Sequence, residues 1–77
     1  MKHFLVTYDR AAGKLLTFRE FEDFERNDAL QESFRLERTH RDNPDVEVVL
    51  LGAESRRALE KTHSRYFKAL DELAKAI

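Results

Sequence analysis

The sequence predicts an α+β domain with the element order ββαβα, in which a three-stranded sheet carries two helices packed on one face. Three observations predict it. Segments near the N-terminus alternate with the period of a strand, and a later run is continuously apolar. Two charged segments have apolar residues at helical spacing. At 77 residues the chain is too short to divide, so residues 1–77 are expected to form one domain.

The first two strands are predicted to form a hairpin. Gly13 closes a loop over Ala11–Gly13, because glycine readily adopts the left-handed conformation that a three-residue hairpin loop needs. Pairing Arg10 with Lys14 then fixes the register, since a slip by one residue would scatter the apolar side chains over both faces. The side chains predicted to share one face are Phe4, Val6, Tyr8, Leu16 and Phe18.

The first helix is predicted from Asn27 or Asp28 to Arg41. Both starting residues are suitable N-caps, and the acidic residues around them suit the positive end of the helix dipole. Pro44 ends the helix, because the residue before a proline is pushed out of helical geometry. The inner face is predicted to carry Leu30, Phe34 and the stem of Glu37, with Ala29, Ser33 and Leu36 beside them.

A buried third strand is predicted over Val46–Leu51, the most apolar run in the chain, and Gly52 ends it. Ser55 is a suitable N-cap for a last helix that reaches about Ala76. Two strand orders are compatible with the pattern, 2-1-3 and 1-2-3. The apolar character of the first strand favours the order 2-1-3, which places that strand in the centre.

The last helix carries an apolar seam with alternating steps of four and three residues, beginning at Leu59. At about 1.5 Å per residue this helix is about 33 Å long, whereas a six-residue strand spans about 20 Å, so its end needs another surface. With both helices on one sheet face, the other face is an exposed apolar patch, and such patches usually mark interfaces. We therefore expect a homodimer or a protein partner. The predicted interface residues are Tyr66, Leu70, Leu73, Ile77, Leu5 and Leu15.

Two Glu-x-x-His pairs, Glu37 with His40 and Glu60 with His63, each place a carboxylate and an imidazole one helical turn apart. In di-iron carboxylate bundles two such motifs combine with further glutamates in a four-helix core. Here only a dimer would supply enough helices. A structural role explains both histidines, because His40 lies in a last helical turn, where the dipole favours it, and His63 lies within the apolar seam. We therefore expect no metal and no cofactor.

The charge pattern bears on nucleic-acid binding. The formal net charge is −1, and nucleic-acid-binding domains usually have a basic excess, so we expect no nucleic-acid partner. A local basic surface is the alternative, in which the arginines of both helices contact nucleic acid. The residues of that alternative are Arg35, Arg38, Arg41, Arg56 and Arg57.

The sequence predicts no catalytic residues. It has no cysteine, its two glycines are far apart, and none of its serines lies in a Gly-x-Ser-x-Gly motif. The lack of cysteine fits a reducing cytoplasm, and no stretch is apolar enough for a signal peptide or a membrane span. The function predicted is a small non-enzymatic module that associates with itself or with a partner. A nucleic-acid-binding regulator and a metal-dependent activity through the Glu-x-x-His pairs are the two alternatives.

Overall fold

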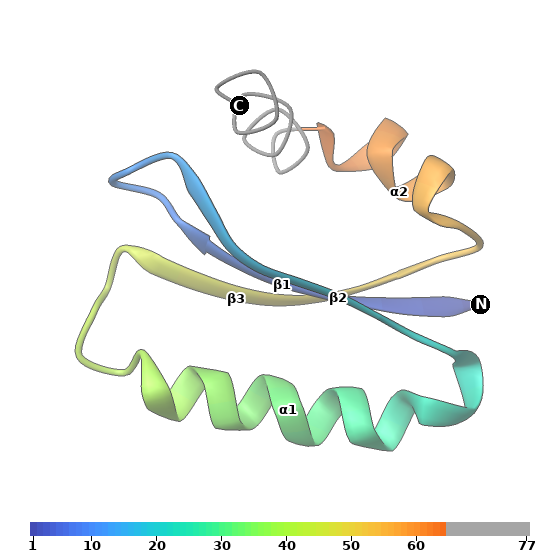
Figure 1. Cartoon of the computed structure of the whole chain (residues 1–77), viewed down its shortest axis with the longest axis horizontal. Coiled ribbons are helices and arrows are strands. Elements are labelled where there is room, and N and C mark those ends of the chain that lie inside the picture. Colours follow the sequence, from blue (N-terminus) through green and yellow to red (C-terminus); the bar gives the residue numbers. More distant parts are fainter. Residues whose placement is uncertain (65–77) are drawn as a thin grey trace.

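The structure is a computed structural model and describes residues 1–64. The elements follow the predicted order, with a short 3-10 helix added before the first α-helix (Figure 1). Their bounds are β1 Lys2–Asp9, β2 Lys14–Phe21, η1 Asp23–Glu25, α1 Arg26–Thr39, β3 Val46–Ala53 and α2 Arg56–Thr62. The predicted α+β class and the predicted succession of strands and helices are therefore confirmed. None of the helices in this part of the chain has the length and apolar character needed to cross a bilayer.

The sheet has the strand order β2-β1-β3, which confirms the favoured order. β1 pairs antiparallel with both neighbours, so β2 and β3 run parallel to each other and form the two edges. The central position of β1 follows from its composition, because its middle residues are buried on both faces of the sheet. These buried residues are Phe4, Leu5, Val6 and Thr7.

The hairpin register follows the prediction as far as a β-bulge. Val6 pairs with Phe18 as expected, but Tyr8 pairs with Leu15, one residue earlier than predicted. Leu16 is the extra residue of the bulge and is 40% exposed. Because a bulge inserts one residue into the alternation, Leu15 takes the sheet face that the sequence analysis assigned to Leu16.

The hairpin loop is one residue longer than predicted, because Lys14 pairs with Asp9 and not with Arg10. The Asp9 carboxylate accepts hydrogen bonds from the backbone N–H groups of Ala11 at 3.0 Å and of Ala12 at 3.1 Å. This local capping by an aspartate side chain stabilises the turn.

The two α-helices lie on opposite faces of the sheet, so the prediction that they share one face is wrong (Figure 1). The α1 side buries Leu5, Phe21, Ala29 and Leu36. The α2 side buries Phe4, Val6, Leu15 and Leu59. The physical reason lies in β1, whose consecutive apolar residues point to both faces, so each face needs a helix to cover it.

The inner face of α1 also differs from the prediction. The buried residues are Ala29, Ser33 and Leu36, spaced by four and three residues. Leu30 is half-buried, and Phe34 is 48% exposed. The small side chains of Ala29 and Ser33 let the helix lie close to the sheet, and Phe34, the largest apolar side chain of the helix, consequently lies away from the core.

α2 begins as predicted, because the hydroxyl of Ser55 accepts a hydrogen bond from the backbone N–H of Ala58 at 3.1 Å. The helix ends at Thr62, and His63 has the non-helical dihedrals φ −130° and ψ 50°. The prediction of one uninterrupted helix to Ala76 is therefore wrong at His63. The inference that the last helix is longer than the strands, and that its end therefore needs another surface, does not apply to α2 as the structure describes it.

Candidate functional site

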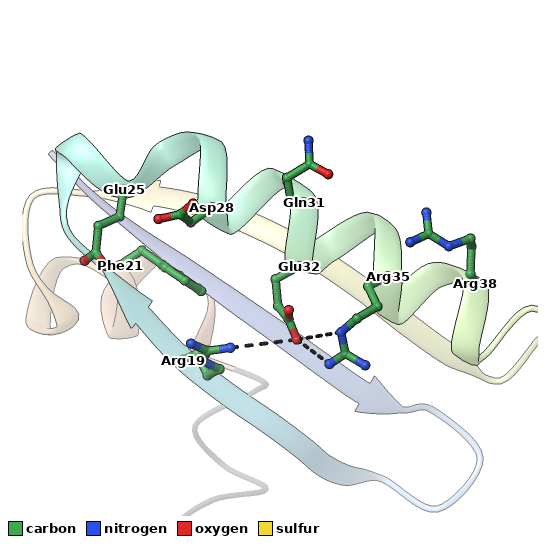
Figure 2. A pocket seen from close by; sticks show the side chains of 8 residues that line it. All are labelled: Arg19, Phe21, Glu25, Asp28, Gln31, Glu32, Arg35 and Arg38. Carbon is green, nitrogen blue, oxygen red and sulfur yellow. Dashed lines mark hydrogen bonds and ion pairs between the residues drawn. The ribbon is translucent and has the colours of Figure 1, made fainter.

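Within residues 1–64, grooves lie on both sides of α1. The first, which we call the β2 groove, has a volume of about 520 Å³ and lies between β2 and α1 (Figure 2). α1 packs mainly over β1 and β3, and the groove lies on the side of the helix that faces β2. The lining residues are Arg19, Phe21, Glu25, Asp28, Gln31, Glu32, Arg35 and Arg38.

An ion-pair network occupies the centre of the β2 groove. Glu32 accepts hydrogen bonds from Arg35 through Nε, at 3.1 Å, and through Nη2, and Arg19 Nη1 lies 3.7 Å from the same carboxylate oxygen (Figure 2). The hydrogen bonds from Arg35 lower the pKa of Glu32, and the positive charges of both arginines act in the same direction. The guanidinium of Arg19 also stacks over Phe21, 4.8 Å from the ring centroid.

The charge of the β2 groove is balanced. Three arginines line it, and three carboxylates, those of Glu25, Asp28 and Glu32, line it as well. Anion-binding sites on proteins carry an excess of positive charge or oriented backbone donors. The β2 groove therefore has no electrostatic preference for phosphate or for an acidic ligand.

The second groove, which we call the β3 groove, has a volume of about 670 Å³ and lies between the end of β3 and the first half of α1. Three consecutive residues of β3 line it, namely Leu50, Leu51 and Gly52. Consecutive strand residues point to opposite faces, so a single groove contacts all three only where it reaches the strand's edge. Met1 and Leu30 add further apolar surface to this groove.

The polar residues of the β3 groove are His3, Asp23 and Arg26. The imidazole Nε2 of His3 lies 3.5 Å from Oδ1 of Asp23 and has no hydrogen-bond partner within residues 1–64. The side chain of His3 is 12% exposed, so the imidazole contributes little to the groove surface. The β3 groove is thus an apolar surface with one acidic and one basic side chain at its end.

The residues predicted for an interface have two different outcomes. Leu5 is fully buried beneath α1, and Leu15 is buried on the α2 side, so neither belongs to an exposed sheet face. The predicted open face is absent from the described fold because the two helices divide between the two faces. Tyr66, Leu70, Leu73 and Ile77 lie outside the described residues.

The two Glu-x-x-His pairs do not come together within one chain. Glu37 and His40 belong to α1 and its end, whereas Glu60 and His63 belong to α2 and its end, on the other face of the sheet. Glu60 forms an ion pair with Arg56 at 3.6 Å. Among residues 1–64, no three side chains of the types that ligate metals gather at one point.

The arginines of the nucleic-acid alternative also divide between the two faces. One group, Arg35, Arg38 and Arg41, lies on α1 and the loop after it, and the other, Arg56 and Arg57, lies on α2. They do not form one continuous basic surface, because the sheet separates the two helices.

Arg19 was not among the predicted site residues, although its ion pair with Glu32 links β2 to α1. A signal was present, because the hairpin register places Arg19 opposite Leu5, on the sheet face that α1 covers. Recognising it would have required knowing that α1 covers that face.

Comparisons of the chain with protein-family models, with curated proteins and with solved structures found no match. The geometry of the chain itself is therefore the guide to its function.

Proposed function

We propose that the chain is a small non-enzymatic module that works by binding a protein surface, either a second copy of itself or a partner protein. One observation carries the proposal. On α1 the small residues Ala29 and Ser33 are buried, whereas Phe34 is exposed and Leu30 lines the β3 groove. Leu30 and Phe34 are four residues apart and therefore lie on the same side of α1, and contiguous apolar surface usually marks an interaction site.

The energetics support this proposal. Fully burying a large apolar side chain contributes roughly 1.5–3 kcal/mol relative to leaving it in water. Phe34 and Phe24, the latter 87% exposed, leave much of that contribution unused in the isolated chain. A domain of this size has a marginal core, so a contact that buries such side chains adds appreciably to its stability.

Size-exclusion chromatography with light scattering tests the proposal. We expect a mass of about twice the chain mass of 9.1 kDa, or a shift to a complex when the partner is added. A monomer that persists at high micromolar concentration, together with no partner in a pull-down from the native host, would contradict the proposal. A cytoplasmic location belongs to the same proposal and is tested by fractionating the host cell.

A further inference from the structure

We propose that two copies of the chain associate through the outer edge of β3, joining their sheets into one antiparallel sheet of six strands with the two α1 helices side by side. The inference rests on the proposed function and specifies its surface and its partner. The partner is a second copy of this chain, related by a two-fold axis perpendicular to the sheet.

The two edges of the sheet differ in how well they are protected. β2 carries Lys14, Arg19 and Glu20 and is interrupted by the bulge at Leu16. Charged side chains and bulges are the features by which proteins keep an edge strand from pairing with another chain. β3 has Glu47 as its single charged residue, and it has neither a proline nor a register shift against β1. Within the described fold β3 pairs with β1 alone, so its outer edge offers unpaired backbone groups to a further strand.

An apolar strip lies beside this edge on the α1 side, formed by Met1, Leu30, Phe34 and Leu50. Met1, Leu30 and Leu50 line the β3 groove together. Phe34 follows Leu30 by four residues and therefore lies on the same side of α1, one turn further along. A strand added at the β3 edge would lie next to this strip, so backbone pairing and apolar burial would occur in one contact.

The strand is compatible with pairing to itself. A two-fold axis perpendicular to the sheet keeps both α1 helices on the same side of the joined sheet. Directly opposed residues of the two β3 strands must then point to the same face, and this holds only if the axis passes beside one residue of β3, which pairs with its own copy. If the axis lies beside Val48, Val49 or Leu50, Glu47 is opposed by Val49, Leu51 or Ala53 of the other copy, respectively. All three of these residues are uncharged. Self-pairing therefore brings no like charges opposite each other within the strand.

The position of α1 also fits a two-fold axis at this edge. α1 packs over both β1 and β3, and neighbouring strands lie about 4.8 Å apart. A helix above the middle of that pair lies about 5 Å from an axis at the β3 edge, so the two α1 helices would lie about 10 Å apart. Packed helices have axes about 8–10 Å apart, so Leu30 and Phe34 of the two copies would meet.

Pairing at the β2 edge would not achieve this contact. An axis there lies about two strand spacings from α1, one spacing further than an axis at the β3 edge, so the two helices would be about 19 Å apart and too far from each other to pack. The β2 groove with its ion pairs would remain open between them. The geometry therefore distinguishes the two edges independently of their charge.

The first test compares two surface substitutions of the same kind. Phe34 and Leu16 are 48% and 40% exposed, so a glutamate at either position is compatible with the folded monomer. We expect Phe34→Glu to raise the dissociation constant of the dimer at least about tenfold, and Leu16→Glu to change it less than about twofold. Sedimentation equilibrium gives the constants, and circular dichroism verifies that both variants are folded.

Each outcome of that test has a distinct meaning. A Phe34→Glu variant as dimeric as the unaltered chain overturns the β3-edge inference. If the unaltered chain dimerises, Phe34→Glu has no effect and the double variant Leu70→Glu/Leu73→Glu dissociates, the proposed function stands with a different surface. If the unaltered chain is monomeric at every concentration, the β3-edge inference and the self-association proposal both fail.

A second test uses the lack of cysteine in the chain. Directly opposed residues of antiparallel strands have Cα atoms about 4.5–5.5 Å apart, within the range that a disulfide spans. We expect one of the single variants Val48→Cys, Val49→Cys and Leu50→Cys to form a covalent dimer under mild oxidation, whereas Leu16→Cys stays monomeric. If none of the three crosslinks faster than Leu16→Cys, the two-fold axis does not lie at β3, and the inference is overturned.

Discussion

Arg35 donates two hydrogen bonds to one carboxylate oxygen of Glu32, the residue three positions before it on α1. Arg19 of β2 approaches the same oxygen, so one carboxylate connects the helix to an edge strand. The network is partly exposed to solvent, so its contribution to the free energy of unfolding is small and sensitive to salt.

The first prediction concerns the pH dependence of stability. The pKa of Glu32 is lowered in the folded chain, so its contribution to stability is present above the unfolded pKa of about 4.3 and is lost as the pH falls through the folded value. Glu32→Gln should therefore lower the free energy of unfolding at neutral pH and converge with the unaltered chain in acid. Urea denaturation at a series of pH values measures this. Glu37→Gln, on the same helix, is the control, and an equal effect of both substitutions would contradict the prediction.

The second prediction concerns the α2 side of the sheet. Leu59 is fully buried and is the residue through which α2 enters the core. Leu59→Ala should lower the free energy of unfolding by about 2–5 kcal/mol, because it leaves a cavity among apolar side chains. Lys61→Ala, on the exposed side of the same helix, should change it by less than about 0.5 kcal/mol. Chemical denaturation measures both, and a loss below about 1 kcal/mol for Leu59→Ala would show that α2 does not cover this face.

The third prediction is a stabilising substitution. Thr7 is fully buried in the central strand, and its hydroxyl has no hydrogen-bond partner within residues 1–64. A buried hydroxyl without a partner costs about 1–3 kcal/mol, and valine has the same shape without the polar atom. Thr7→Val should therefore raise the midpoint of thermal unfolding. Thr17→Val is the matched control, because Thr17 pairs with Thr7 across the hairpin and is exposed. A lower midpoint for Thr7→Val than for the unaltered chain would contradict the prediction.

The fourth prediction concerns metal binding. Because the two Glu-x-x-His pairs lie on opposite faces of the sheet, residues 1–64 of one chain offer only two ligands at each place. Structural zinc sites need four ligands. Calorimetric titration with zinc, manganese or iron should therefore show no tight stoichiometric binding. A one-to-one complex that is lost in both His40→Ala and His63→Ala would contradict this expectation.

Local patterns predicted most of the fold. The three strands and the cap at Ser55 were each predicted from neighbouring residues, and the structure confirms all of them. The central position of β1 was also predictable, because the apolar character of a strand reflects how many of its sides are covered.

Features that depend on contacts between elements were predicted less well. Nothing in the residues around Leu16 distinguishes a regular strand from a bulge. Because of the bulge, Leu15 is buried at the position predicted for Leu16, and Leu16 is exposed. Hydrophobicity alone predicted Phe34 on the inner face of α1. In the structure the small residues Ala29 and Ser33 are buried there, because they let the helix lie close to the sheet. The consecutive apolar residues Phe4, Leu5 and Val6 point to both faces of the sheet, and the open apolar face that was predicted as an interface is covered by a helix of the same chain.

Because β1 is first in the chain and central in the sheet, its second edge stays open until the end of β3 has been synthesised. The register between β1 and β3 joins Lys2 to Ala53, so the sheet closes over nearly the whole described chain. Such distant pairing slows folding, whereas the β1–β2 hairpin is local and forms early. A nascent chain that stops before Val46 therefore exposes an apolar hairpin with no third strand, and exposed apolar surface and unpaired strand edges of this kind are prone to aggregation.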